Sequence, residues 1–142
     1  MGNYPIPAYH FRVDWGSQQY EFSEVIGLSM EVAVIEHRDG SSASNIISKL
    51  PGLVKYSNII LKRPLIKGDT EFFDWIKMVH QNAGFRRNVT ITLLNEENVP
   101  VVIWKVRNAW PCKYIGGSLN ATSNEVAMET IELTHEGLEM EK

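Results

Sequence analysis

Alternating apolar and polar positions run through most of the chain and predict β-strands. From Tyr9 to Trp15 every second side chain is apolar, and the same alternation returns from Asn88 to Leu94. A period of two is typical of a strand that buries one face. The polar stretch Asn95 to Asn98 separates the second run from another apolar run, Val99 to Arg107. These two runs therefore predict a β-hairpin.

A longer strand-like run extends from Tyr20 to Ile35, with Gly27 near its middle. Glycine inside a strand usually marks a bulge or a bend. Beyond Gly27, one face of this run is apolar and the other is small or polar, which suits a sheet facing water or a water-filled channel. The residues on such polar faces that we expect to line a channel are Ser29, Glu31, Thr90 and Thr92.

A short segment with both turn and strand signals follows later in the chain. Pro51-Gly52 predicts a type II turn, because proline presets φ at the first central position and glycine accepts the positive φ of the second. Tyr56 to Arg63 alternates incompletely and predicts a strand buried on one side, with Ile59 and Leu61 on its apolar face. Pro64 lacks a backbone N–H for the ladder, so we expect the strand to end there.

The stretch from Glu36 to Lys55 predicts a long loop. Arg38 to Ser44 is a plain turn signal, and scattered apolar residues follow it. Loops of about 20 residues are uncommon inside a compact domain and are usually functional or disordered. The apolar residues of this loop favour a function.

One helix is predicted, over about 70–83. Its apolar side chains recur at the i, i+3, i+4, i+7 spacing of a helix with one buried face. Asp69 or Thr70 can cap its first free amides, and Gly84 is placed as its C-terminal cap. The stripe consists of Phe72, Trp75, Ile76, Val79 and Ala83.

The two ends of the chain carry weaker signals. Residues 1–8 contain two prolines and predict an extended arm, while 137–142 predict a flexible tail. Glu125 to His135 has helix formers such as Met128, so propensity alone leaves helix and strand open there.

Size and composition predict one domain over 1–142 with its own core. The chain has 142 residues, of which 44% are hydrophobic and 22% charged, and a formal net charge of -3. That mild acidity argues against an outer surface that grips nucleic acid, which needs clustered Lys and Arg. No apolar run reaches the roughly 20 residues of a membrane span, so we expect the chain to fold in the cytoplasm without a membrane anchor. Cys112 is the single cysteine and forms no internal disulfide.

Candidate chemistry is sparse, and we predict no catalytic, cofactor or metal site. The four histidines, His10, His37, His80 and His135, are scattered and lack the short spacing of metal ligands. Glu36 to Asp39 gathers ionisable groups, but consecutive loop residues point in different directions and no pocket is indicated. Cys112 lies at no helix N-terminus that would activate it, so we interpret it as structural.

The segment Lys49 to Pro64, K-L-P-G-x-x-K-Y-x-N-I-x-L-K-R-P, resembles the tail-tube proteins of contractile phages and phage-like injection particles. Three further segments resemble that family in the same order along the chain. They are Phe11 to Trp15, Asn108 to Tyr114 and Ser123 to Leu138. The resemblance thus spans nearly the whole chain.

The resemblance implies an α+β fold of mainly antiparallel strands, a β-sandwich or barrel with one helix, and makes Glu125 to His135 a strand. It implies a structural subunit that forms hexameric rings, stacked into an inner tube around a cargo channel, with no catalysis. Its implied partners are copies of itself, sheath and baseplate proteins, and DNA or effector protein as cargo. The choice of cargo, and of phage or injection system, stays open.

Other classes of protein remain as alternatives. One is a baseplate tube-adaptor or a secreted ring protein of the haemolysin-coregulated type. Another is a small ligand-binding barrel or enzyme, which would need a pocket of convergent polar groups.

We expect the long loop to be mobile in a free subunit and ordered in a tube. The predicted subunit-interface residues are Arg38, Asp39, Ile46, Ile47, Leu50, Pro51, Gly52, Tyr56 and Phe73.

Overall fold

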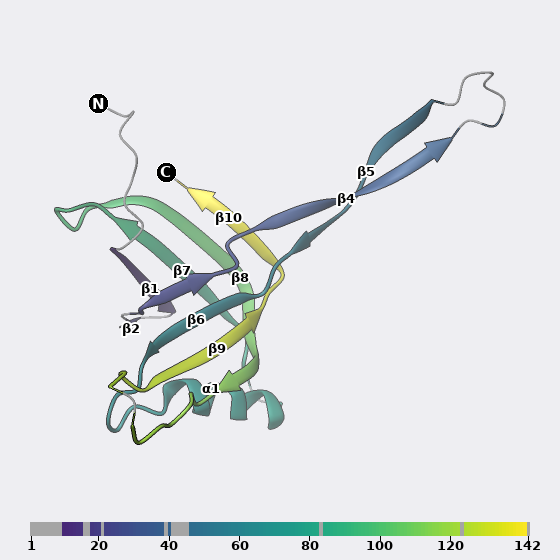
Figure 1. Cartoon of the computed structure of the whole chain (residues 1–142). Helices are drawn as coiled ribbons and strands as arrows, with labels where there is room; N and C mark the ends of the chain where they lie inside the picture. Colours follow the sequence, from purple (N-terminus) through teal and green to yellow (C-terminus); the bar gives the residue numbers. More distant parts are fainter. Residues whose placement is uncertain are drawn as a thin grey trace.

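The computed structural model describes residues 10–15, 18–20, 22–38, 40, 46–82, 84–122 and 124–141. Antiparallel strands dominate this part of the chain, and a single helix accompanies them, which confirms the predicted fold class (Figure 1). The elements are β1 (Phe11–Trp15), β2 (Gln18–Tyr20), β3 (Glu24–Ile26), β4 (Met30–Arg38), β5 (Ile47–Tyr56), β6 (Ile59–Pro64), α1 (Glu71–His80), β7 (Arg87–Leu94), β8 (Pro100–Ile115), β9 (Met128–Thr134) and β10 (Gly137–Glu141).

The body of the molecule is one open sheet, with strand order β2-β1-β7-β8-β9-β6-β3. Strand β8 connects the two halves of this sheet, because its first part pairs with β7 and β10 and its last part pairs with β9. The predicted hairpin of β7 and β8 is confirmed. Alternate side chains from both halves meet in one buried cluster, so the sheet folds over a shared core.

Aromatic residues of the helix complete this core. Phe72 and Trp75 of α1 are fully buried, and the Trp15 ring centroid lies 4.9 Å from that of Trp75. The apolar face predicted for β6 is also confirmed, since Ile59 and Leu61 are both 0% exposed. The other members of the cluster are Val13, Phe22, Val89, Ile91, Val106, Ala109, Ile131 and Leu133.

The helix begins close to the predicted residue and is shorter than predicted. Asp69 is the side chain that caps it, because its Oδ1 accepts a hydrogen bond from the Glu71 amide at 3.0 Å. Thr70 makes no side-chain cap. The C-cap is Gln81 and not the predicted Gly84, which lies three residues further along with a φ of 38°. Ala83, the last member of the predicted stripe, lies outside the described residues.

One prediction about the second half of the chain was wrong. The flexible tail is strand β10, whose Leu138 packs against the core beside β8. The Trp110-Pro111 pair does not interrupt β8, which continues through it to Ile115. The ladder shifts register between Pro111 and Lys113, and a bulge of this kind tolerates a residue without an N–H. The predicted arm at 1–8 lies outside the described residues.

The predicted long loop at 36–55 was also wrong, because β4 and β5 form a two-stranded hairpin over most of it. This hairpin projects away from the body (Figure 1). Pro51-Gly52 is no turn; it lies within β5, where the pairing shifts by a residue next to Val34. Gly27 marks the predicted break, between β3 and β4, with a φ of 101°.

Candidate functional site: the assembly surface

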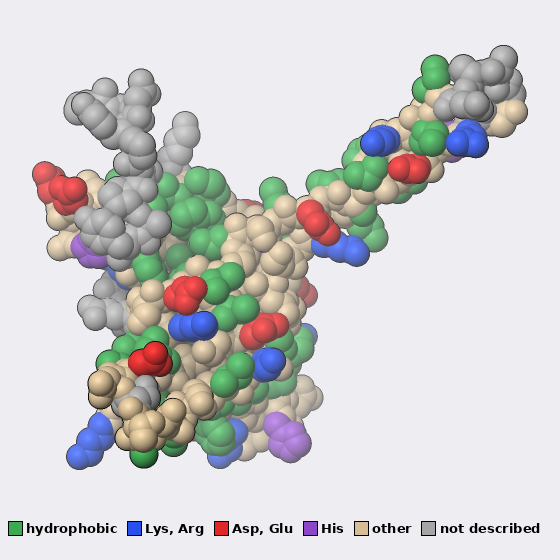
Figure 2. Space-filling model, in the orientation of Figure 1, with side chains coloured by type: hydrophobic (Ala, Val, Ile, Leu, Met, Phe, Trp, Pro, Cys, Tyr) green, Lys and Arg blue, Asp and Glu red, His purple; other side chains and the backbone are tan. Residues whose placement is uncertain are grey.

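The β4–β5 hairpin exposes many apolar side chains and has no core of its own. Pairs such as Val32 opposite Val54 and Ile35 opposite Leu50 cover one another only across the ribbon. Hydrophobic groups alternate with charged ones along it (Figure 2). Its large apolar side chains are between 40% and 80% exposed: Met30, Val32, Val34, Ile35, Ile46, Ile47, Leu50, Leu53 and Val54. So many exposed large apolar side chains on one element indicate an interaction site.

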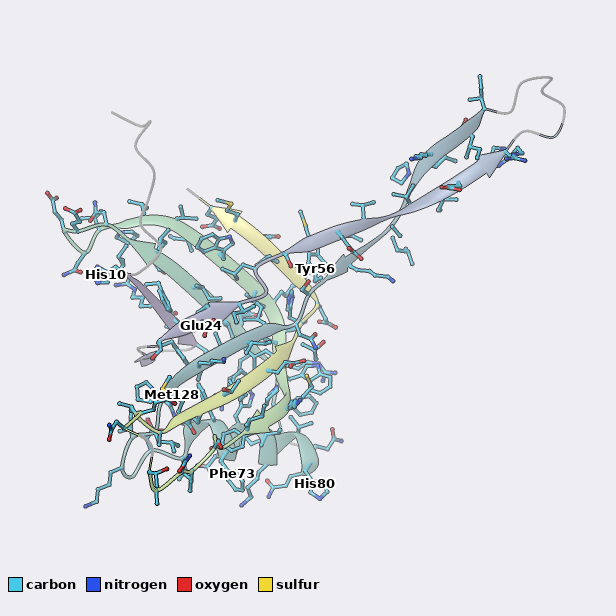
Figure 3. All side chains as sticks on the ribbon, in the orientation of Figure 1. His10, Glu24, Tyr56, Phe73, His80 and Met128 are labelled. Atoms are coloured by element: carbon cyan, nitrogen blue, oxygen red, sulfur yellow. The ribbon has the colours of Figure 1, made fainter. Side chains whose placement is uncertain are left out.

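Most of the predicted interface residues come together on this hairpin. They are Arg38, Ile46, Ile47, Leu50, Pro51, Gly52 and Tyr56. Asp39 lies outside the described residues. Phe73 is 49% exposed on α1, far from the hairpin base that Tyr56 marks (Figure 3). The Phe73 ring meets the Tyr114 ring edge-on at 5.8 Å, so it belongs to a separate surface.

Gly52 occupies a narrow place inside the hairpin. A Cβ added there would lie 3.1 Å from the Ala33 carbonyl oxygen and 3.1 Å from Cγ1 of Ile35. Glycine therefore lets the two strands approach closely beside the bulge at Pro51. Pro51 and Gly52, which predicted a turn, therefore lie at the irregular part of the β4–β5 pairing instead.

The four predicted channel-lining residues do not share one surface. Ser29 and Glu31 are exposed at the base of the hairpin and along it, whereas Thr90 and Thr92 lie on β7 in the body. Thr92 is only 2% exposed, so this part of the prediction does not fit the single subunit. Ser29, Glu31 and the half-buried Thr90 stay predictions.

A polar row that the sequence analysis missed crosses the outer face of the body. Asp14 pairs with Thr90, Thr90 with Lys105, and Lys105 with Glu139. Burial raises the pKa of Asp14, although the charge of Arg12 opposes the rise. The sequence does contain a signal for a polar face on β8, because Lys105 and Arg107 are two residues apart and therefore lie on the same face of the strand. The row carries both signs of charge.

A second exposed apolar surface lies at the other end of the body, where β6 and β8 end and β9 begins. The amide of Leu65 donates to the Ala127 carbonyl at 2.9 Å, which brings these ends together. Leu119 and Val126 are 82% and 69% exposed there, and Ile66 is 52% exposed. A shallow cavity of about 510 Å³ lies between Ser118 and Ala127.

A buried ionic network holds the helix against the sheet. Arg63, 1% exposed, donates from Nε to Oε1 of Glu129 at 2.6 Å and from its terminal nitrogens to Asp69 at 3.2 Å. The Tyr114 hydroxyl donates to the other Glu129 oxygen at 2.8 Å. Burial and this hydrogen bond raise the pKa of Tyr114. Burial opposes ionisation of Asp69, yet the Glu71 amide and Arg63 together lower the pKa of Asp69.

The described residues offer little to catalysis. No group of three or more His, Cys, Asp or Glu side chains among them is placed to hold a metal ion. Burial, with the charge of Glu132, raises the pKa of the Cys112 thiol, which disfavours the reactive thiolate. Within the described ranges, no helix is both long and apolar enough to cross a membrane.

Comparisons with known proteins agree with the resemblance found in the sequence. Residues 7–139 match the family described as T4-like virus tail tube protein gp19. No curated protein is detectably similar in sequence. Among solved structures, a chain of the PVC sheath-tube complex, an extracellular contractile injection system in its extended state, is 35% identical. It superposes with a TM-score of 0.90 over 99% of this chain and 93% of that one.

Two further structures extend the comparison. A chain from the anti-feeding prophage cap, which terminates the AFP tube, is 32% identical, with a TM-score of 0.89 over 99% of this chain and 93% of that one. Hcp1 from Flavobacterium johnsoniae is 16% identical, with a TM-score of 0.58 over 93% and 94%, and shares the fold alone. The chain therefore belongs to the T4-like tail tube family and is a structural subunit of an inner tube.

Proposed function

We propose that this subunit closes into rings of six, which stack into the inner tube of a contractile phage tail or injection system around a cargo channel. The exposed hairpin carries the proposal. A lone two-stranded ribbon is marginally stable at best in water, and its apolar side chains find no cover in their own subunit. Another copy of the chain is a partner that is always present during assembly, so it supplies that cover.

The open sheet edges support ring closure. Strands β2 and β3 end the main sheet, and β10 pairs with β8 alone among the described strands, so each keeps one unpaired side. Strand β6 is not such an edge, because it lies between β9 and β3. Joining two different edges in turn around a ring would satisfy their backbone groups. The number six rests on the family resemblance.

We further propose sheath and baseplate proteins as partners of the outer surface. The solved relatives come from particles whose names include a sheath-tube complex, a sheath/tube terminator and a baseplate. Identity is 35% to the sheath-tube chain and 25% to the baseplate chain, which favours the main tube over a tube-adaptor. Assembly in the cytoplasm, a role without catalysis, and DNA or effector protein as cargo belong to the same proposal.

Native mass spectrometry and electron microscopy of the purified protein test this function. We expect multiples of six subunits and long tubes. Rings that never stack would favour the secreted ring protein. Monomer alone at micromolar concentration and moderate salt would contradict the proposal, and heat-stabilisation of that monomer by a small molecule would favour a ligand-binding barrel.

A further inference from the structure

We propose that His135, Asn58 and Glu132 are positioning residues that set the direction of the hairpin before a neighbouring subunit receives it. The inference rests on the proposed tube assembly. Both strands of the hairpin break where they leave the body: 27–29 separates β3 from β4, and 57–58 separates β5 from β6. Tyr56, labelled in Figure 3, lies at this base. The hairpin therefore joins the body through a hinge made of two short breaks.

The two breaks are bonded to each other. The Ser57 amide donates to the Ser29 carbonyl at 3.2 Å, and the Ser29 hydroxyl donates to the Ser57 hydroxyl at 2.8 Å. A Cβ on Gly27 would lie 2.0 Å from the Asn58 carbonyl oxygen, so only glycine fits. These contacts keep the two breaks together, but they do not tie them to the rest of the sheet.

Side chains of β9 and of the residue after it tie the hinge to the rest of the sheet. We call the three residues His135, Asn58 and Glu132 the latch. His135 Nε2 lies 3.0 Å from the Ser57 carbonyl oxygen, and since a carbonyl only accepts, Nε2 carries the hydrogen and donates. The Tyr56 ring packs on the same imidazole at 5.5 Å. Next along the chain, Asn58 Nδ2 donates to Glu132 Oε2 at 2.8 Å. Two neighbouring hinge residues, Ser57 and Asn58, are thus hydrogen-bonded to two side chains of the body.

Beyond this base, the described elements hold the hairpin only weakly. Strands β4 and β5 pack extensively on each other, and neither makes a comparably large contact with another described element. At about 3.3 Å per residue, the ribbon reaches roughly 30 Å, so a swing of about 20° at the hinge would move its tip by roughly 10 Å. A ribbon that samples many directions must lose that freedom on docking, and a preset direction reduces this cost. The latch therefore favours assembly without adding any contact to the neighbour.

The position of the latch separates positioning from folding. Ser57 and Asn58 are exposed, Glu132 and His135 are half-buried, and none of the four belongs to the buried core. Removing the latch should leave the thermal stability of the body nearly unchanged while it weakens assembly. Removing a residue that only stabilised the fold would instead lower the thermal stability of the body as well as weaken assembly.

The first test measures the protein concentration at which tubes form, by light scattering and pelleting. We expect His135→Ala to raise it about five- to tenfold, the effect of one lost hydrogen bond per subunit. Asn58→Ala, at an exposed position, tests the same latch if His135→Ala folds poorly. His135→Gln keeps a side-chain N–H donor and should restore most of the effect. His80→Ala, at an exposed histidine on α1 (Figure 3), is the matched control and should change nothing.

The second test measures the hairpin direction in subunits that have not assembled. Spin labels at Leu53→Cys and Val99→Cys, in a Cys112→Ser background diluted with unlabelled protein, report the distance between hairpin and body. We expect His135→Ala to broaden the distance distribution and His135→Gln to leave it close to that of the unaltered latch. Unchanged distributions, or broadening with no change in tube formation, would overturn the inference. If the unaltered protein forms no tubes, the proposed function fails, yet the distances still decide whether the latch exists.

Discussion

Two consecutive strands, β5 and β6, behave in opposite ways although the chain passes directly from one to the other. In β6, Ile59 and Leu61 are fully buried between the sheet halves, while in β5 Leu50 and Leu53 are 48% and 80% exposed. Both strands are apolar and both are paired. The difference is that β6 has a second layer to pack against. The apolar content of a strand therefore does not indicate whether the strand packs into the core of its own subunit or is left to contact a neighbouring subunit.

The largest effect is expected when the outer end of the hairpin is removed. Replacing Arg38 to Ser48 with a short Gly-Ser linker should leave the circular dichroism and melting temperature of the body almost unchanged, because neither hairpin strand makes a large contact with another described element. Tube formation should be lost completely, as judged by electron microscopy. Tubes of normal length and heat resistance from this variant would show that the outer end of the hairpin does not drive assembly.

The opposite change attacks the body and spares the hairpin. Glu129→Ala removes one of the two carboxylates that pair with the buried Arg63, the one at 2.6 Å, and breaking a buried pair costs about 3 to 5 kcal/mol in the free energy of unfolding. Chemical denaturation measures this loss. Glu141→Ala is the control, since its pair with Lys105 is about half exposed and should cost less than about 1 kcal/mol. Equal losses for the two variants would contradict the role of the buried network.

The same substitution in the two strands gives a direct comparison. Leu61→Ala should lower the free energy of unfolding by about 2 to 5 kcal/mol, because it leaves a cavity in the core. Leu53→Ala should stay within about 0.5 kcal/mol, because its side chain is already in water. Tube formation should respond to Leu53→Ala instead. A large loss of subunit stability from Leu53→Ala would mean that the hairpin packs on the body after all.

The smallest expected effect is a dependence on pH within the body. The pKa of Asp69 is lowered by folding, so its contribution to stability is fully present above the ordinary value of about 3.9 and is lost as the pH falls through the lower folded value. Asp69→Asn should therefore be less stable by about 1 to 2 kcal/mol at pH 7. Denaturation curves of the two proteins should converge in acid. A difference that persists at pH 2 would assign the effect to something other than charge.

Local patterns predicted the body well. Alternation located β1, β6 and the β7–β8 hairpin, and the 3.6-residue stripe located α1, because each of these elements buries one face at a fixed spacing. The strand at Glu125 to His135 was undecided by propensity and was settled only by family resemblance; the structure has β9 there.

The hairpin could not be predicted in the same way. Pro51-Gly52 normally signals a turn, but in a two-stranded ribbon each strand has one open side, where a missing N–H costs nothing. The residues of β10 gave no core pattern of their own, and they became a strand because the edge of β8 lay open beside them. The latch was equally hidden, since His135 and Ser57 are 78 positions apart.

The segments that must bury a face can be read from the sequence alone, and so can the family to which the chain belongs. Which faces are covered within the subunit, and which remain open, depends on how the elements pack together. Burial depends on the second layer above a strand, and that layer comes from residues distant in sequence. Where the chain supplies it, as above β6, a core forms; where it does not, as along the hairpin, the apolar surface is left for another subunit.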